Sequence, residues 1–154
     1  MSLSDDEMTL TRPGDGAGLA DLHRQSFETP WDTGAFEALL TQQGVIGVRH
    51  GEGFILCRAI LDEAEILTLA VNPAARRSGL GLRLVEAAGG LSAHAGVLRL
   101  FLEVAEDNAA ARGLYARAGF ISEGRRKGYY ARKDTPAVDA LLLSLNLAGR
   151  LPTD

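Results

Sequence analysis

Residues 65–94 contain three patterns in direct succession: an apolar strand pattern, a basic loop with two glycines and a helical apolar pattern. The segment EILTLAV (65–71) predicts a strand, which the following Asn72-Pro73 pair ends. Gly79 and Gly81 then stand where a helix over about residues 81–94 begins, although glycine costs a helix about 1 kcal/mol relative to alanine. A strand–loop–helix unit is typical of α/β folds, and glycines at the helix entrance require a reason of their own.

The loop RRSGLG (76–81) has the composition of an anion site, and single residues exclude two common phosphate loops. A dinucleotide fingerprint requires a third glycine where Leu84 stands, and a Walker loop requires a G-K-[ST] sequence that the chain lacks. The remaining R-x-x-G-x-G pattern suits a pyrophosphate, because backbone amides at a helix N-terminus carry partial positive charge. Arg76, Arg77 and Arg83 add charge nearby. A tight turn that holds no ligand is the alternative explanation of these six residues.

Periodicity along the rest of the chain predicts helices and strands without repeats or long linkers. Helices are expected over residues 15–27, 35–40 and 108–118, the second after a capping Asp32 and the third between Asn108 as cap and Gly119 as stop. Strands are expected over residues 45–50, 53–61, 97–105, 120–126 and 138–147, with a short first strand at 8–12 and a loop carrying Tyr129 and Tyr130 after residue 126. This order predicts an α/β fold, with a mixed sheet and helices on both faces, rather than a Rossmann fold.

The composition fits one soluble domain over residues 1–154. Charged residues make up 23% and hydrophobic residues 46% of the chain. No apolar run approaches the roughly 20 residues that a membrane span requires. The acidic stretch MSLSDDEMTL lacks the order of a secretion signal and the single cysteine permits no intrachain disulfide, so we expect a cytoplasmic protein. Three widely separated histidines give no metal-ligand spacing, and we expect no metal.

The net charge of −4 is unevenly distributed along the chain. Between Arg112 and Lys133 stand seven basic residues and one acidic residue, so this window carries +6 and the rest of the chain −10. The asymmetry fits either a solvated basic flank or a basic part that faces an anionic cofactor while the acidic surface attracts a cationic substrate. The acidic balance argues against nucleic-acid binding.

Two longer segments, LTLAVNPAARRSGLGLRLVEAA and LFLEVAEDNAAARGLYARAGF, together resemble the GNAT family (GCN-five-related N-acetyltransferases). The shared pattern is R-x-x-G-x-G after a strand and N-x-x-A-x-x-L-Y-x-x-x-G-F downstream, over about residues 64–126. Within that family, EILTLAV, LFLEV, NAAARGLY, GRRKGYY and DALLLSLNL are similar to the RimI-like group, which acetylates the N-terminal alanine of a small-subunit ribosomal protein. The resemblance implies the GNAT fold, with a mixed central sheet of about six to seven strands flanked by about four helices.

The resemblance also implies acetyl-CoA as the cosubstrate. Its pantetheine arm would pair with the strand edge at Leu69, Ala70 and Val71 like an added strand, and would bind the side chain of Asn108. The backbone N–H of Val71 would stabilise the oxyanion. Asn108 also suits a structural role as the helix cap. The pyrophosphate would lie on the backbone amides of the glycine loop, at Arg77, Ser78, Gly79, Leu80, Gly81 and Leu82.

Acetyl transfer to an amine requires a base for the amine and an acid for the departing thiolate. Glu103 stands near the C-terminal end of its expected strand, where sites of α/β proteins collect, and on the face opposite the alternating residues Leu98, Leu100, Leu102 and Val104. Position alone favours an ordinary outward-facing glutamate. The resemblance of LEV to the RimI-like group implies instead that Glu103 is the base, directly or through a water. The resemblance implies Tyr115 as the acid, and a phenol with a pKa of about 10 stays protonated at neutral pH. An aromatic residue packed beneath the sheet is the alternative for Tyr115.

Aromatic residues indicate the acceptor side. Trp31 lies in a loop between the first two expected helices, and the corresponding loop borders the acceptor in the GNAT family. Tyr129 and Tyr130 suit the wall of an acceptor channel. The alternatives are a hydrophobic staple for Trp31 and the closure of a hairpin for the two tyrosines. Cys57, within an apolar strand, is interpreted as a core residue, and no role is assigned to the histidines.

We therefore expect a cytoplasmic, acetyl-CoA-dependent N-acetyltransferase that transfers directly, in a ternary complex, to a protein N-terminal α-amine. The expected acceptor is the N-terminal alanine of a small-subunit ribosomal protein, with no nucleic acid or membrane as partner. One alternative keeps the fold and changes the acceptor to a small amine such as an aminoglycoside or polyamine. The other is a CoA-binding regulatory module without turnover, against which the presence of both Glu103 and Tyr115 counts.

Overall fold

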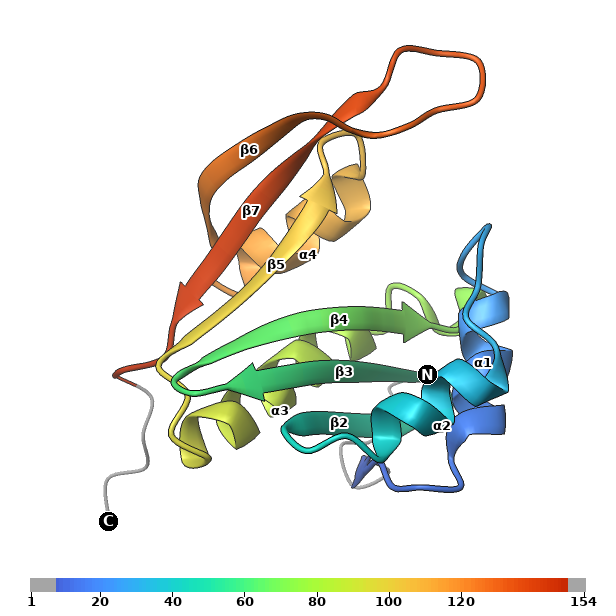
Figure 1. Ribbon diagram of the computed structural model, residues 1–154, viewed down its shortest axis with the longest axis vertical. Helices are drawn as coiled ribbons and strands as arrows, with labels where there is room; N and C mark the ends of the chain where they lie inside the picture. The colour runs from blue at the N-terminus through green and yellow to red at the C-terminus, as the bar shows by residue number, and fades with distance from the viewer. Residues whose placement is uncertain (1–7, 150–154) are drawn as a thin grey trace.

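The computed structural model describes residues 8–149, and most of the acidic N-terminal stretch lies outside these residues. Figure 1 shows the arrangement of the elements. The helices are α1 (Gly16–Arg24), α2 (Thr33–Leu40), α3 (Leu80–His94) and α4 (Ala109–Arg117), with a short 3-10 turn at Pro73–Ala75. The strands are β1 (Thr9–Leu10), β2 (Val45–His50), β3 (Gly53–Ile60), β4 (Glu63–Val71), β5 (Arg99–Ala105), β6 (Ile121–Tyr130) and β7 (Val138–Asn146).

The strands of the described residues form one sheet of seven in the order β1-β2-β3-β4-β5-β7-β6. Neighbouring strands are antiparallel except β4 and β5, which run parallel. Helices α3 and α4 pack on one face of the sheet, and α1 and α2 lie on the other (Figure 1). The predicted mixed α/β sheet with helices on both faces is confirmed.

One local expectation is wrong, because Tyr129 and Tyr130 lie in strand β6 rather than in a loop. The pairing of β6 with β7 is interrupted by a bulge after Arg126 and resumes at Tyr130. Gly128 takes a φ of 62° in this bulge, and its N–H donates to the Asp139 carboxylate at 2.8 Å. A residue in the left-handed conformation, held by a side chain of the neighbouring strand, therefore lets β6 continue where the sequence predicted its end.

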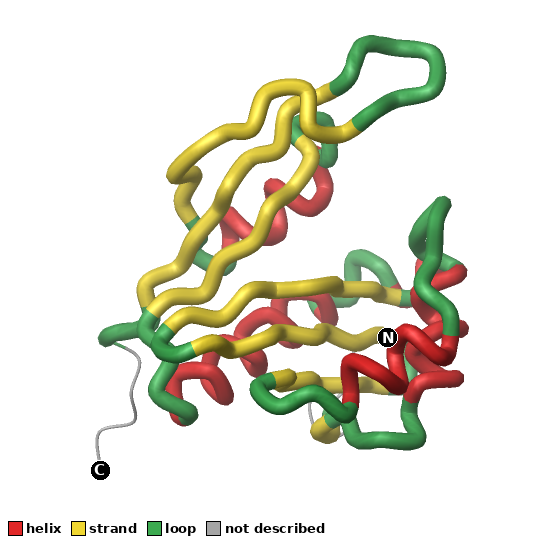
Figure 2. Tube along the Cα trace, viewed as in Figure 1, coloured by secondary structure: helices red, strands yellow, loops and turns green. Residues whose placement is uncertain are grey.

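Strands β4 and β5 separate soon after they begin. They pair only over residues 63–65 of β4 and 99–101 of β5. Beyond that point β4 continues along β3 and β5 continues along β7, and Figures 1 and 2 show the two strands diverging towards their carboxyl ends. We call the opening between residues 66–71 of β4 and 102–105 of β5 the wedge. Strands that part in this way leave the backbone groups of their facing edges without strand partners.

A bulge in β4 distributes its apolar residues between two cores. Adjacent residues of β3 pair with Ile66 and Thr68, so Leu67 is the additional residue. Ile66 consequently packs in the core beneath α3, whereas Ala70 packs in the core beneath α1 and α2. In an unbulged strand, Ile66 and Ala70 would face the same side, because side chains alternate with period two. The bulge thus sets the orientation of the strand at the point where the wedge opens.

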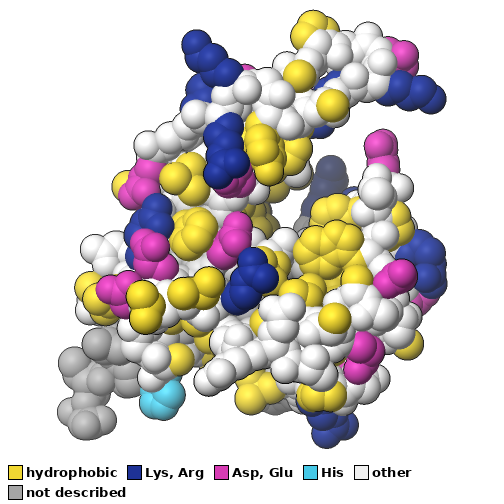
Figure 3. Space-filling model, viewed as in Figure 1, with side chains coloured by type: hydrophobic (Ala, Val, Ile, Leu, Met, Phe, Trp, Pro, Cys, Tyr) yellow, Lys and Arg dark blue, Asp and Glu magenta, His cyan; other side chains and the backbone are white. Residues whose placement is uncertain are grey.

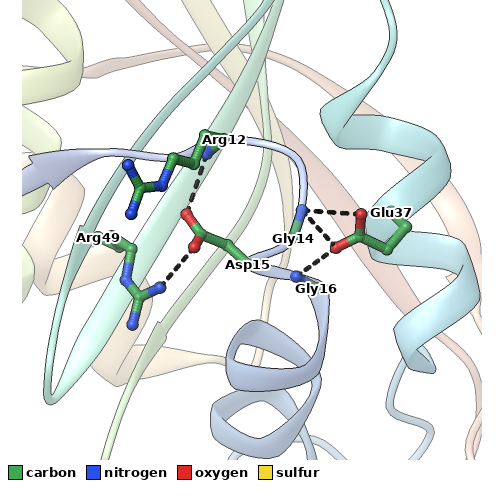
Figure 4. A network of polar contacts seen from close by, with 6 residues as sticks. All are labelled: Arg12, Gly14, Asp15, Gly16, Glu37 and Arg49. Atoms are coloured by element: carbon green, nitrogen blue, oxygen red, sulfur yellow. Dashed lines mark hydrogen bonds and ion pairs between the residues drawn. The ribbon is translucent and has the colours of Figure 1, made fainter.

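Helices α1 and α2 are joined by a carboxylate of α2 that binds the start of α1 (Figure 4). Glu37 of α2 accepts hydrogen bonds from the backbone N–H groups of Gly14, at 3.0 and 3.1 Å, and Gly16, at 2.6 Å. These bonds satisfy amides that a helix N-terminus leaves unpaired. A Cβ on Gly16 would lie 2.5 Å from the Glu37 carboxylate, so this contact requires glycine. Asp15 adds an ion pair to Arg49 of β2 at 2.8 Å, which ties the helix pair to the sheet.

Candidate active site

The glycine loop presents the N-terminus of α3. Arg77 and Gly79 have φ angles of 67° and 85°, so the chain turns through two left-handed residues before the helix. The N-cap is Gly79, which has no side chain to close the first turn. Ser78 stabilises the loop, because its hydroxyl donates to the Ala75 carbonyl at 2.6 Å and accepts from the Leu80 N–H at 3.3 Å. The remaining amides of the first turn have no partner within an α-helix, which is the property that anion sites at helix N-termini use.

The second glycine of the loop places α3 directly beside the wedge. A Cβ on Gly81 would contact Leu114 of α4 at 3.4 Å and Val71, the last residue of β4, at 3.8 Å. The start of α3, the end of β4 and the middle of α4 therefore meet at one point. The glycine loop therefore lies next to the carboxyl end of β4, where the wedge is open.

The edge of β4 that faces the wedge is defined by the antiparallel ladder with β3. The register places Asn72 opposite Glu52, and the Asn72 N–H donates to the Glu52 carbonyl at 2.7 Å. Because hydrogen-bonded and non-hydrogen-bonded pairs alternate, the backbone amides of Leu69 and Val71 face away from β3, whereas that of Ala70 faces it. Leu69 and Val71 thus present their polar backbone groups to the wedge. The expected strand edge at residues 69–71 is present, with Ala70 contributing to the opposite side.

Glu103 lies on β5 where this strand forms one wall of the wedge. Its neighbours Leu102 and Val104 are buried in the core with α3 and α4, so Glu103 projects from the opposite face of the sheet. Its Oε1 atom pairs with the guanidinium of Arg126 at 3.0 Å. Its Oε2 atom is buried and has no hydrogen-bond partner among residues 8–149. A carboxylate oxygen in that position can accept a proton or bind a water.

Tyr130 is a neighbour of this carboxylate. Burial raises the pKa of the Tyr130 hydroxyl, and the negative charge of Glu103 raises it further. Tyr129 and Tyr130 pack edge to face with ring centroids 5.1 Å apart, and the Arg126 guanidinium lies 5.2 Å from the Tyr129 ring centroid. The structure therefore brings both predicted tyrosines to the end of β6 beside the candidate base.

Tyr115 lies on the other face of the sheet from Glu103. Its ring is 5% exposed and packs edge to face against Phe120, with centroids 5.3 Å apart. Burial raises the pKa of its hydroxyl, and the nearby Cys57 contributes to the same shift. The phenol is therefore protonated over the physiological pH range. Tyr115 is therefore packed beneath the sheet, as the alternative to the catalytic role expected. Its hydroxyl also keeps the proton that a general acid requires.

Asn108 is the N-cap of α4, as predicted. Its side-chain oxygen accepts a hydrogen bond from the Ala111 N–H at 3.1 Å. Gly119 ends the same helix region with a φ of 97°. The capping role is thus confirmed, and it places Asn108 about two helical turns from Tyr115.

The loop between α1 and α2 carries Trp31, which is 37% exposed. The Trp31 backbone N–H donates to Nδ1 of His23 at 3.1 Å, and the two rings stack with centroids 5.0 Å apart. His23, to which the sequence assigned no role, is buried and joins this loop to β4. The sequence holds only a weak signal for this contact, a histidine eight residues before the isolated Trp31. The two rings come together only in the folded loop.

Two loops approach each other across the mouth of the wedge. The hydrogen bonds that the Arg132 guanidinium donates to the Asp107 carboxylate raise the pKa of Arg132, and the charge of Glu28 in the α1–α2 loop contributes to this shift. Arg132 follows β6, and Figure 1 shows the loop after β6 and the loop after α1 facing each other. Figure 3 shows an opening between these parts of the surface, bordered by hydrophobic and charged side chains.

Other candidate chemistry is structural. Cys57 is fully buried and burial raises its pKa to about 12, which confirms it as a core residue. Within residues 8–149, no group of three or more His, Cys, Asp and Glu side chains could hold a metal ion. None of the helices in the described part of the chain has the length and apolar character needed to cross a membrane.

Comparisons with known proteins agree with this geometry. The ribosomal protein bS18-alanine N-acetyltransferase of Haemophilus ducreyi is 31% identical over 136 residues, which cover 84% of this chain and 92% of that protein. The protein of the same name from Escherichia coli K12 is 36% identical over 109 residues, which cover 71% of this chain and 70% of that protein.

Solved structures show the same fold. The crystal structure of the ribosomal-protein-S18-alanine N-acetyltransferase from Escherichia coli matches with a TM-score of 0.81 at 27% identity over 96% of both chains. Arabidopsis thaliana NAA60, solved in complex with acetyl-CoA, matches with a TM-score of 0.76 at 20% identity over 90% of this chain and 98% of that chain. The acetyltransferase (GNAT) family model covers residues 17–120. The chain is an N-acetyltransferase and belongs to the acetyltransferase (GNAT) family.

Proposed function

We propose that the chain acts in the cytoplasm, as a single domain, as an acetyl-CoA-dependent acetyltransferase of the N-terminal alanine of a small-subunit ribosomal protein. The observation that carries the proposal is the wedge between β4 and β5. One wall presents the backbone N–H groups of Leu69 and Val71, which face away from β3, and the other carries Glu103, whose Oε2 atom is buried without a hydrogen-bond partner within residues 8–149. The names of the relatives from Haemophilus ducreyi and Escherichia coli support the alanine acceptor.

The residues at the wedge fit acetyl-CoA. The amides of residues 77–82 would hold the pyrophosphate, because the loop leaves the first turn of α3 open. The edge of β4 at residues 69–71 would pair with the amide-containing pantetheine arm as an added strand. Asn108 would add a side-chain contact beside its capping bond. When bound, acetyl-CoA supplies an acetyl group activated as a thioester.

The side chains around the wedge divide the proton transfers between them. Glu103 takes a proton from the acceptor ammonium through its Oε2 atom, directly or through a water. The Val71 N–H stabilises the oxygen that gains negative charge as the new amide bond forms. The Tyr115 hydroxyl gives its proton to the thiolate that leaves. Because the amine has a pKa of about 8, the base has to remove a proton that is only weakly held at neutral pH.

The acceptor would enter on the face of the sheet that carries Glu103. Trp31 from the α1–α2 loop and the pair Tyr129 and Tyr130 from β6 border this side. Aromatic walls can enclose a short side chain and an extended backbone without providing a charged partner. With Glu103 as the base, the α-amine of the acceptor would lie beside Tyr130.

The proposal is tested by mass spectrometry of acetyl transfer to an alanine-first, arginine-rich peptide. The matched control is the same peptide with a blocked N-terminus and one internal lysine. We expect one acetyl group on the first peptide, located at the α-amine by fragmentation, and none on the control. Acetylation of the lysine alone, or of aminoglycosides and polyamines in preference to the peptide, would refute the N-terminal acceptor. Binding of acetyl-CoA without any product would identify a regulatory module.

A further inference from the structure

His23 occupies a position that the proposed mechanism does not use. It is 2% exposed, although it lies on the short helix α1 close to the mouth of the wedge. Its Nε2 atom lies 3.1 Å from the Thr68 hydroxyl of β4, and its Nδ1 atom lies 3.1 Å from the backbone nitrogen of Trp31. Both ring nitrogens of a buried histidine are therefore engaged, one with a strand and one with a loop.

These two contacts define the state of the imidazole. The backbone N–H of Trp31 can only donate, so Nδ1 of His23 has to accept and carries no proton. The ring hydrogen consequently lies on Nε2, which donates to the Thr68 hydroxyl. His23 is thus a neutral imidazole in the Nε2–H form.

Aromatic rings surround the imidazole. His23 stacks on Phe27 with centroids 4.1 Å apart and on Trp31 at 5.0 Å, and it meets Phe36 edge to face at 5.2 Å. Phe54 of β3 lies at 6.4 Å. These groups belong to the α1–α2 loop, α2 and β3, and together with the Thr68 hydroxyl of β4 they are uncharged. Within the described residues, nothing in contact with the ring would compensate a positive charge on it.

The strand contact connects this cluster to the cofactor side of the wedge. Thr68 directly follows the bulge residue Leu67 and precedes Leu69, whose amide faces the wedge. The loop contact reaches Trp31, which borders the acceptor side. His23 therefore bridges the strand that would hold the cosubstrate and the loop that would contact the acceptor.

We propose that His23 is a positioning residue that holds the α1–α2 loop, and Trp31 in particular, against β4 and so shapes the acceptor wall. This inference rests on the proposed function in so far as Trp31 contacts the acceptor. It predicts that loss of the Nδ1 contact weakens acceptor binding while leaving acetyl-CoA binding and the chemical step nearly intact. His23 touches no reacting atom in this arrangement.

Three substitutions separate the two contacts. His23→Asn places an amide oxygen near the position of Nδ1 and keeps an acceptor for the Trp31 N–H. His23→Gln places an amide nitrogen near the position of Nε2 and keeps the bond to Thr68. His23→Leu removes both. His94→Asn at the exposed end of α3 is the matched control, because it changes a histidine that lies far from the loop.

Steady-state kinetics with the alanine-first peptide give the first readout. We expect the KM for the peptide to rise about tenfold in His23→Leu and His23→Gln, which corresponds to about 1.4 kcal/mol, with kcat and the KM for acetyl-CoA changed less than about twofold. His23→Asn should recover most of the peptide affinity, and His94→Asn should behave as wild type. Unchanged peptide KM in His23→Leu, or an equal rise for both substrates, would overturn the proposal.

Fluorescence gives a second readout that does not depend on the acceptor. Trp31 is the sole tryptophan of the chain, so the emission reports this loop alone. In His23→Leu and His23→Gln the emission should move to longer wavelength and iodide should quench it more strongly, with His23→Asn close to wild type. Identical spectra and quenching in all variants would refute the positioning role. If wild type acetylates no peptide while these spectra change as expected, the proposed function fails and the positioning of the loop stands.

Discussion

Replacement of Glu103 by glutamine tests the base directly, because the structure separates the two oxygens of this carboxylate. Oε1 pairs with Arg126 at 3.0 Å, whereas Oε2 is buried without a partner among the described residues. Glutamine keeps the shape and an oxygen for Arg126 but has no basic site. The Arg126 side chain is 62% exposed, so losing the ion pair should change the free energy of unfolding by less than about 1 kcal/mol. The variant therefore isolates the chemical role of the carboxylate.

The expected loss depends on pH in a calculable way. An α-amine with a pKa of about 8 is about 9% neutral at pH 7 and about 91% neutral at pH 9. General base catalysis contributes about 10²–10⁴ in rate, so Glu103→Gln should lower kcat/KM about 100-fold at pH 7. At pH 9 the amine reaches its neutral form unaided, and the loss should be about tenfold smaller. The assay is the initial rate of CoA thiol release with the alanine-first peptide at both pH values.

Glu123→Gln provides the matched control. Glu123 pairs with Arg99 at 2.6 Å, where β4 and β5 are still joined at the closed end of the wedge. This variant loses a comparable arginine–carboxylate pair and should retain wild-type rates at both pH values. Equal losses for Glu103→Gln at pH 7 and pH 9 would show that Glu103 is not the base.

Four further predictions follow from particular contacts. Tyr115→Phe keeps the packing on the neighbouring ring, so kcat should fall about 100-fold while calorimetry shows unchanged acetyl-CoA affinity; unaltered turnover would leave Tyr115 as a core residue. Glu37→Ala removes the acceptor of the partly buried Gly16 amide and of the exposed Gly14 amide, and should lower the free energy of unfolding in urea by about 1 kcal/mol, with Glu37→Gln recovering part of it. Gly79→Ala forces a side chain to a φ of 85° at a strain of about 1–2 kcal/mol, and should weaken acetyl-CoA binding more than peptide binding. Burial lowers the pKa of His23, so the unfolded chain binds a proton near pH 6.5 before the folded chain does. The free energy of unfolding should therefore fall as the pH drops below about 6.5 and level off below the folded-state pKa, a dependence that His23→Asn should remove.

Short-range signals predicted most of the elements correctly. The side chains of Asp32 and Asn108 cap α2 and α4 as expected, because a cap depends on a residue and an amide three positions away. Alternation along β5 separated buried Leu102 from Glu103 on the other face, because the period of a strand is a local property. The glycine loop was recognisable for the same reason, although the left-handed conformation of Arg77 was not.

Long-range pairing decided the features that the sequence did not reveal. The loop predicted after residue 126 is strand because Gly128 forms a bulge that Asp139 of β7 stabilises. The carboxylate of Glu37 closes the first turn of α1 from a different helix, and His23 acquires its two partners from β4 and a loop. Each of these contacts joins residues that no periodicity relates.

The sequence by itself determined the order of elements, the position of the glycine loop at the start of α3 and the residue types available for proton transfer. Only the tertiary structure decided that β4 and β5 part after residue 65 and 101 respectively, and that the amides of Leu69 and Val71 face the opening. The physical reason is that a strand pattern specifies which side chains are buried but not which backbone edge finds a partner. Beyond residues 65 and 101, β4 remains paired with β3 and β5 remains paired with β7, so the wedge separates two continuous ladders.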